Sequence, residues 1–227
     1  MQGWTLVFDL DGTLVDTAPD LAAATNHVLA RAGLAPINES EILPFVGHGA
    51  MKMIEQALAA HGRRADPLEL KEHFDSFIAH YRANIAVNSR PFPGIIAALT
   101  SFQRQGASLA VCTNKMEVHA RALLDALDMT KHFAALTGGD SLGVSKPNPK
   151  HLTGTIDLAK GSAARSIMIG DSETDIRTAQ AAHIPVVAVN FGYSVEPVSS
   201  FAPDVIISHY DELPGAISSL TAARSAQ

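Results

Sequence analysis

Short, continuous apolar runs separated by segments of helical period limit what this sequence can fold into. The apolar runs occupy residues 6–8, 109–112, 166–169, 186–189 and 205–207. Runs of this length and continuity are typical of strands that are buried on both faces of a parallel sheet. Because parallel strands are joined by right-handed helical crossovers, the sequence predicts an α/β fold with a doubly wound, Rossmann-like parallel sheet.

Residues 16–90 break this alternation. They contain segments of helical period at residues 21–32, 51–61 and 68–85. None of these residues form a run that is typical of a strand, and the proline-rich turn Pro91–Gly94 leads back into the alternating pattern. The sequence therefore predicts an inserted helical domain at 16–90 and an α/β core made of residues 1–15 and 91–227.

Composition excludes several classes of protein. The 227 residues are 47% hydrophobic and 18% charged, which is typical of a globular chain and not of a disordered one. The net charge of −6 disfavours nucleic acid as a partner, and no apolar stretch is long enough to span a membrane. The N-terminus does not resemble a signal peptide, and the single cysteine, Cys112, cannot form an internal disulfide. We therefore expect a cytoplasmic protein that binds neither nucleic acid nor membrane; its oligomeric state is left open.

Polar residues follow the predicted strands directly, where doubly wound sheets place their active sites. The segments concerned are Asp9-Leu10-Asp11-Gly12-Thr13, Thr113-Asn114-Lys115 and Gly170-Asp171-Ser172-Glu173-Thr174-Asp175. A fourth segment, with Lys146, lies in a loop before another predicted helix. Because the carboxyl ends of parallel strands meet at one edge, these groups are expected to converge.

The expected set of groups suits phosphoryl transfer, which needs charge neutralisation and in-line positioning. Asp9, Asp11 and Asp171 would repel one another unless a hard divalent cation lay between them, and oxygen ligands favour Mg²⁺. A carboxylate nucleophile would give an acyl phosphate, and a second acid would move the protons. These roles alone do not single out one reaction, and solvated loop carboxylates are the alternative interpretation.

Three further residues are candidates for contact with the phosphoryl group. Thr113 and Asn114 offer hydrogen-bond donors to phosphate oxygens, and the helix that follows them adds main-chain N–H groups. Lys146 supplies a positive charge for the phosphoryl group or for Asp9. Each of these residues taken alone is also typical of a helix cap or of the surface.

Together the segments resemble the haloacid dehalogenase-like hydrolase superfamily over nearly the whole chain. Asp9-Leu10-Asp11-Gly12-Thr13 is similar to its first motif, and the later motifs fall on Thr113, Lys146 and Asp171 with Asp175. The resemblance implies that Asp9 is the nucleophile and Asp11 the general acid and base. It implies Mg²⁺ bound by the Asp9 side chain, the Asp11 carbonyl and Asp171. Ser172 and Asp175 would support that site from further out, and residues 16–90 would form a cap that excludes water.

Within the superfamily the chain is most similar to the phosphoglycolate phosphatases. The residues that carry this resemblance are Val46-Gly47-His48-Gly49, Gly138-Gly139-Asp140 and Phe191-Gly192-Tyr193. It implies hydrolysis of 2-phosphoglycolate, with His48 and Lys52 of the cap meeting the substrate carboxylate. Alternatively, His48 only shapes its loop and Lys52 is solvated.

Other functions fit the same motifs. The substrate could be a sugar phosphate, a nucleoside monophosphate or pyrophosphate, because the sequence does not define the specificity of the cap. A sugar phosphomutase or a non-catalytic binding module on the same fold are the remaining alternatives, and a dehalogenase would not need this arrangement of acids.

Overall fold

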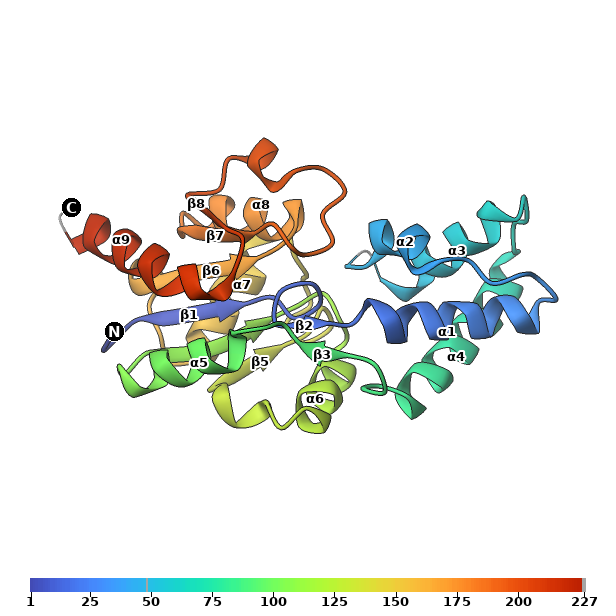
Figure 1. Cartoon of the computed structure of the whole chain (residues 1–227), viewed down its shortest axis with the longest axis horizontal. Coiled ribbons are helices and arrows are strands. Elements are labelled where there is room, and N and C mark those ends of the chain that lie inside the picture. The colour runs from blue at the N-terminus through green and yellow to red at the C-terminus, as the bar shows by residue number, and fades with distance from the viewer. Residues whose placement is uncertain (48, 226–227) are drawn as a thin grey trace.

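A six-stranded parallel sheet forms the centre of the computed structural model, which describes residues 1–47 and 49–225 (Figure 1). The strands, in chain order, are β1 (Thr5–Phe8), β4 (Ser108–Cys112), β5 (Ala135–Thr137), β6 (Ser166–Gly170), β7 (Val186–Val189) and β8 (Val205–Ile207). They are arranged in the order β5-β4-β1-β6-β7-β8, and every neighbouring pair is parallel. The central strand β1 therefore directs its carboxyl end into the middle of one sheet edge.

Helices cover both faces of this sheet. They are α5 (Ile95–Arg104), α6 (Glu117–Ala126), α7 (Pro149–Leu158), α8 (Glu173–Ala181) and α9 (Leu213–Ser225). Leu6 and Phe8 of β1 pack in one apolar cluster with α5, α6 and α9, whereas Val7 packs in another with α7 and α8. Because alternate side chains of the strand are buried on opposite faces, the run Leu6-Val7-Phe8 is apolar without interruption. The predicted doubly wound α/β fold is confirmed.

One strand of the sheet was not predicted. The five predicted apolar runs all form strands, but β5 adds a sixth at the edge of the sheet. Its three residues are Ala135, Leu136 and Thr137, of which two are only partly buried. An edge strand with one neighbour does not need a continuous apolar run, so its sequence resembles a loop.

A second lobe consists of helices from the segment for which an inserted domain was predicted (Figure 1). They are α1 (Ala18–Arg31), α2 (Glu39–Ile42), α3 (Ala50–Ala60) and α4 (Pro67–Ala83). Leu29 of α1, Ile54 of α3 and Phe77 of α4 are buried in one apolar cluster that is separate from the two clusters of the sheet. The lobe thus has its own core, as expected for an independently packed unit.

Two short connections join this lobe to the sheet. The strands β2 (Val15–Asp16) and β3 (Arg90–Pro91) form an antiparallel pair there. Asp20, buried in the first turn of α1, accepts hydrogen bonds from the main-chain N–H groups of Asn88 and Ser89, at 2.8 to 3.0 Å. These bonds fix the outgoing and returning chain segments side by side.

Short 3₁₀ helices complete the fold. They are η1 (Leu43–Phe45), η2 (Thr130–His132), η3 (Ala163–Arg165), η4 (Val198–Phe201) and η5 (Tyr210–Glu212). Within the ranges 1–47 and 49–225, we find no helix of the length and apolarity that a membrane span requires.

A buried histidine in α7 makes the stability of the fold sensitive to acid. His151 is fully buried, and neither ring nitrogen has a hydrogen-bond partner among the described residues. Burial, and then the charge of Lys146, lower its pKa to about 4. The folded state therefore binds this proton less well than the unfolded state, so stability is retained above about pH 6.5 and lost as the pH falls towards 4.

Replacing His151 by Leu should remove that acid sensitivity. Between pH 7 and pH 4 the wild-type chain is expected to lose up to about 3 kcal/mol more free energy of unfolding than the His151→Leu variant. Urea unfolding of both proteins at a series of pH values measures the difference. If the two curves stay parallel down to pH 4, the buried imidazole is not the cause.

Candidate active site

The predicted site residues converge at the carboxyl edge of the sheet. Asp9 follows β1, Thr113 follows β4, and Asp171 follows β6. A cavity of about 40 Å³ at this edge is lined by Asp9, Asp11, Thr113, Asn114, Lys115, Lys146, Ser172 and Thr174. Val46 and Gly47 of the helical lobe also line it, so the lobe covers the site.

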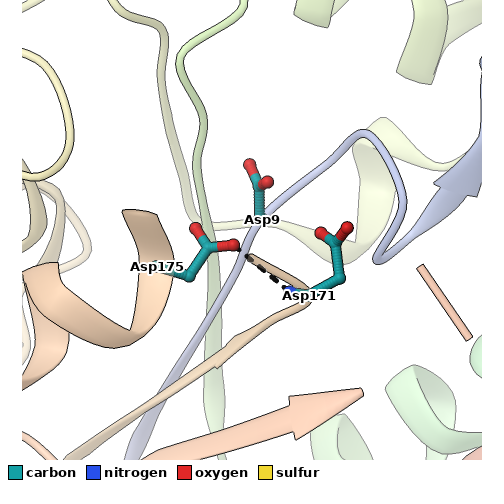
Figure 2. Close-up of side chains that lie close together, drawn as sticks. All are labelled: Asp9, Asp171 and Asp175. Atoms are coloured by element: carbon teal, nitrogen blue, oxygen red, sulfur yellow. Dashed lines mark hydrogen bonds between the residues drawn. The ribbon is translucent and has the colours of Figure 1, made fainter. Parts of the chain in front are cut away.

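Three carboxylates form a buried cluster beside this cavity. Asp9, Asp171 and Asp175 each place one oxygen within 4.8 Å of the others (Figure 2). Asp171 accepts hydrogen bonds from Thr13 Oγ1 and from the main-chain N–H of Tyr193, both at 2.8 Å. Asp175 accepts from the N–H groups of Asp171 and Ser172 and from Ser172 Oγ. It lies in the first turn of α8, which Ser172 caps. Asp175 thus fixes the loop that carries Asp171.

Lys146 connects two of these carboxylates. Its Nζ atom lies 2.7 Å from Asp9 Oδ1 and 2.6 Å from Asp175 Oδ1, with 2% of the side chain exposed. Burial opposes the charged form of Lys146, but the attraction of Asp175 and Asp9 outweighs burial and raises its pKa. The lysine is therefore a fixed positive charge beside the predicted nucleophile.

The cluster fits a hard divalent cation. Burial, followed by repulsion from Asp175, raises the pKa of Asp171. Burial also raises the pKa of Asp9, and it outweighs the attraction of Lys146, which lowers that pKa. Although Asp9 Oδ1 is ion-paired with Lys146, it is buried without a well-aligned hydrogen bond among the described residues. Carboxylate oxygens that are short of positive charge and of hydrogen-bond donors are the ligands that Mg²⁺ prefers. Each oxygen of Asp171 accepts one hydrogen bond and keeps a lone pair for the cation. Asp175 is more fully engaged, because one oxygen accepts from Lys146 and the other accepts three hydrogen bonds.

Asp11 lines the same cavity and is paired with a second lysine, Lys115. Thr17 Oγ1 donates to Asp11 Oδ1 at 2.7 Å, and Lys115 Nζ lies 2.9 Å from both carboxylate oxygens. The ammonium of Lys115 also lies 4.9 Å from the centre of the Tyr81 ring of α4. Asp11 is thus held in place at the cavity wall. Through Tyr81 the helical lobe contacts Lys115, the lysine that is paired with Asp11.

The chain matches the family model for haloacid dehalogenase-like hydrolases over residues 6–189. It belongs to this family. A phosphoglycolate phosphatase from Mesorhizobium japonicum is 51% identical over 208 residues, which cover 92% of each chain. Another from Agrobacterium fabrum is 44% identical over 93% of this chain and 91% of its own length. The predicted family is confirmed.

Solved structures agree with this assignment. A protein described as a predicted phosphoglycolate phosphatase from Haemophilus somnus has a TM-score of 0.89 and 28% sequence identity, covering 95% of this hydrolase and 98% of its own chain. The similarity spans both the sheet and the helical lobe, since few residues of either chain lie outside it.

The amide of Asn114 holds two loops of the hydrolase together. Its Nδ2 atom donates to the carbonyl of Lys146 at 3.0 Å, and its Oδ1 atom accepts from the N–H of Lys146 at 2.9 Å. Thr113 is buried, and its Oγ1 accepts from the N–H of Lys115. Asn114 therefore sets the main-chain position of Lys146, and contact of Thr113 or Asn114 with phosphate stays a prediction.

Glycine is required where two loops of the hydrolase approach Asp171. Gly12 has φ +80°, and a Cβ atom there would lie 2.4 Å from Asp171 Oδ2. At Gly192 an added Cβ would lie 2.2 Å from the Cβ of Asp171. Any side chain at either position would displace the carboxylate of Asp171. Both positions are therefore glycine because the main chain passes so close to that residue.

Tyr193 is a site residue to which the sequence assigned no role. Its main-chain N–H donates to Asp171, while its hydroxyl donates to Asp16 at 2.6 Å and accepts from the N–H groups of Thr17 and Ala18. One residue thus links the acidic cluster to the connection that leads into α1. Its place after Phe191 and Gly192 was noticed only as part of a family resemblance.

The two residues expected to read the substrate carboxylate are placed differently. His48 lies outside the described residues. Lys52 in α3 is about half exposed, lies 3.6 Å from Glu55, and lines a separate surface pocket with Arg63 and Arg64. Its part in specificity stays a prediction, and the described cations nearest to the catalytic cavity are Lys115 and Lys146.

Proposed function

We propose that this chain is a magnesium-dependent phosphatase that hydrolyses 2-phosphoglycolate through an aspartyl phosphate on Asp9. The observation that carries the proposal is the convergence of Asp9, Asp11 and Lys146 around one small cavity beneath the helical lobe. The names of the curated relatives at 51% and 44% identity support the substrate, since both are phosphoglycolate phosphatases.

In the first step a carboxylate oxygen of Asp9 attacks phosphorus, and the bond from phosphorus to the ester oxygen breaks. Lys146 lies 2.7 Å from Asp9 and offsets negative charge where the phosphoryl group arrives. Asn114 holds the main chain of Lys146 in place through two hydrogen bonds. The proton that the departing glycolate oxygen needs comes from Asp11, which lines the same cavity.

In the second step water attacks phosphorus, and the bond from phosphorus to Asp9 breaks. Asp11 takes the proton of the water, and inorganic phosphate is released with Asp9 restored. Thr17 and Lys115 hold the Asp11 carboxylate in place, which keeps one geometry for both proton transfers.

The metal would be held by Asp9 and Asp171, with the main-chain carbonyl of Asp11 as the expected third protein ligand. When bound, Mg²⁺ supplies positive charge that offsets the phosphoryl oxygens. Ser172 and Asp175 would keep Asp171 in position, and Thr13 and Tyr193 donate hydrogen bonds to Asp171 from the other side.

The helical lobe, residues 16–90, would act as a cap. Val46 and Gly47 already line the catalytic cavity, and Tyr81 contacts Lys115. Closure of such a lobe excludes water from the phosphoryl donor and strengthens each ionic contact inside.

The test is phosphate release by the purified chain across a panel of esters. The panel contains 2-phosphoglycolate, sugar phosphates, nucleoside monophosphates and pyrophosphate, each with Mg²⁺ and with a chelator. We expect the highest kcat/KM for 2-phosphoglycolate and a loss of at least about 100-fold on chelation that added Mg²⁺ reverses.

The alternatives give different results in the same panel. A preference for another ester would replace the substrate and keep the mechanism. A sugar phosphomutase would convert one sugar phosphate into an isomer with little release of phosphate. Chelator-resistant release would contradict the role of the acidic cluster.

A further inference from the structure

A second cavity adjoins the catalytic one and has apolar walls. Its volume is about 240 Å³, and it shares Asp11, Gly47, Asn114 and Lys115 with the smaller cavity. The remaining walls come mainly from the helical lobe, as Met51, Met53, Phe74, Phe77 and Ile78. Asp11 lines both cavities, so this space adjoins the group that would protonate the ester oxygen.

Lys115 is the one side chain with a permanent positive charge among the described residues that line this larger cavity. Its side chain is 8% exposed, and burial in apolar surroundings makes its charge a strong anchor for an anion. An ammonium carries three N–H donors, and the only carboxylate that Lys115 contacts among the described residues is that of Asp11. A second anion can therefore bind to the same ammonium.

Two further polar atoms on the walls of this cavity lack a well-aligned hydrogen bond. The hydroxyl of Tyr81 and Nδ1 of His119 are buried, and the hydroxyl has the Lys115 ammonium as its neighbour among the described residues. The ring planes of Tyr81 and His119 meet edge to face, with centroids 6.3 Å apart, so both residues lie beside Lys115. Buried polar atoms are rarely left unpaired, so these two atoms are available to a polar group that enters the cavity, whether a ligand or water.

We propose that Lys115 and Tyr81 form the subsite that binds the carboxylate of the substrate, which makes Lys115 the specificity-determining residue. This inference rests on the proposed function. In 2-phosphoglycolate a single methylene separates the ester oxygen from the carboxylate carbon. A substrate whose ester oxygen meets Asp11 therefore places its carboxylate beside the lysine that contacts Asp11.

The other lysines considered for this role already form ion pairs with acidic residues of the chain. Lys146 contacts both Asp9 and Asp175, and 2% of its side chain is exposed. Lys52, the lysine for which the sequence suggested this role, pairs with Glu55 and lines a different pocket. Carboxylate recognition by Lys115 would also require the helical lobe, since Tyr81 belongs to α4.

The test compares two substrates that differ only in the carboxylate. These are 2-phosphoglycolate and 2-hydroxyethyl phosphate, in which a neutral alcohol replaces the anion. For Lys115→Met we expect the ratio of their kcat/KM values to fall by at least about 30-fold, mainly through KM for 2-phosphoglycolate. Tyr81→Phe, which removes one hydroxyl, should lower the same ratio by about 3- to 10-fold.

Thr17→Val separates recognition of the carboxylate from support of Asp11. It removes a hydrogen bond to Asp11 and leaves the lysine in place, so kcat should fall on both substrates and the ratio should stay unchanged. Lys71→Met, at an exposed lysine of α4 that pairs with Asp75, should leave both substrates unaffected.

The outcomes distinguish this inference from the proposed function. If Lys115→Met lowers activity on both substrates equally, Lys115 acts only through Asp11 and the inference fails. If Lys52→Met changes the ratio and Lys115→Met does not, the subsite lies on α3 and the inference also fails. If the wild-type chain prefers 2-hydroxyethyl phosphate while Lys115→Met folds normally, the proposed substrate is wrong.

Discussion

Replacing Asp9 by Asn is expected to lower kcat for phosphate release by at least about 10⁴-fold, because an amide cannot form the aspartyl phosphate. Loss of the nucleophile removes the covalent route, because the carboxylates of Asp11 and Asp171 are already held by other side chains. Steady-state phosphate release from 2-phosphoglycolate with Mg²⁺ measures the effect. Asp157→Asn, at an exposed residue of α7, is the matched control and should retain full activity.

The same substitution should not destabilise the fold. Asp9 is a buried carboxylate whose pKa is raised, first by burial, so its charge is unfavourable in the folded state. Asn has nearly the same shape, and Lys146 keeps Asp175 as its partner. We expect an unchanged or higher Tm, and a Tm several degrees lower would mean that the loss of activity reflects unfolding. Retention of more than about 1% of kcat in a folded variant would identify another nucleophile.

The position of the candidate catalytic residues could be predicted because the sheet determines it. The strands at 6–8 and 166–169 are apolar on both faces, so their neighbours must be parallel strands and their carboxyl ends must meet. Asp9 and Asp171 follow those ends directly, and their convergence follows from the order of elements. The segment that ends in Asp175 and the loop with Lys146 were expected at the same edge, but the individual roles of these two residues depended on family resemblance.

The supporting contacts could not be predicted, because they join residues far apart in the chain. Lys115 meets Asp11 across 104 positions, and Tyr193 meets Asp16 across 177. A lysine after Thr113 and Asn114 is as compatible with a solvated loop as with a buried ion pair. The position of Lys115 at the same sheet edge was the available signal. Its burial could be recognised only from the structure, in which Tyr81 of α4 contacts its ammonium.

The choice of a cap residue for substrate specificity also depended on local sequence, and it shows the same limit of prediction. The lysine chosen for its place near Gly47 and Gly49, Lys52, lies on α3 beside Glu55, since the next turn of the helix offers it an acid. Helix periodicity says which residues share a face, but not which face turns towards the core domain. That orientation is set by the apolar cluster of Leu29, Ile54 and Phe77.

Replacing Lys146 by Met is expected to lower both activity and stability. The ammonium lies 2.7 Å from Asp9 and 2.6 Å from Asp175, so its loss leaves two buried carboxylates without their shared cation. Breaking a buried ion pair in this way costs about 3–5 kcal/mol of the free energy of unfolding, and loss of the charge beside the phosphoryl group should reduce kcat by about 10³-fold. Urea unfolding without Mg²⁺ and phosphate release with it measure the two effects.

A second substitution separates these two roles of Lys146. In the double variant Lys146→Met and Asp175→Asn one of the two uncompensated charges is gone, so part of the lost stability should return, while kcat should stay low. Lys150→Met, at an exposed lysine in the first turn of α7, controls for loss of positive charge in the same region and should change neither quantity. If the double variant regains activity together with stability, Lys146 serves the fold alone. If stability does not return, the ion pair with Asp175 is not what the single substitution broke.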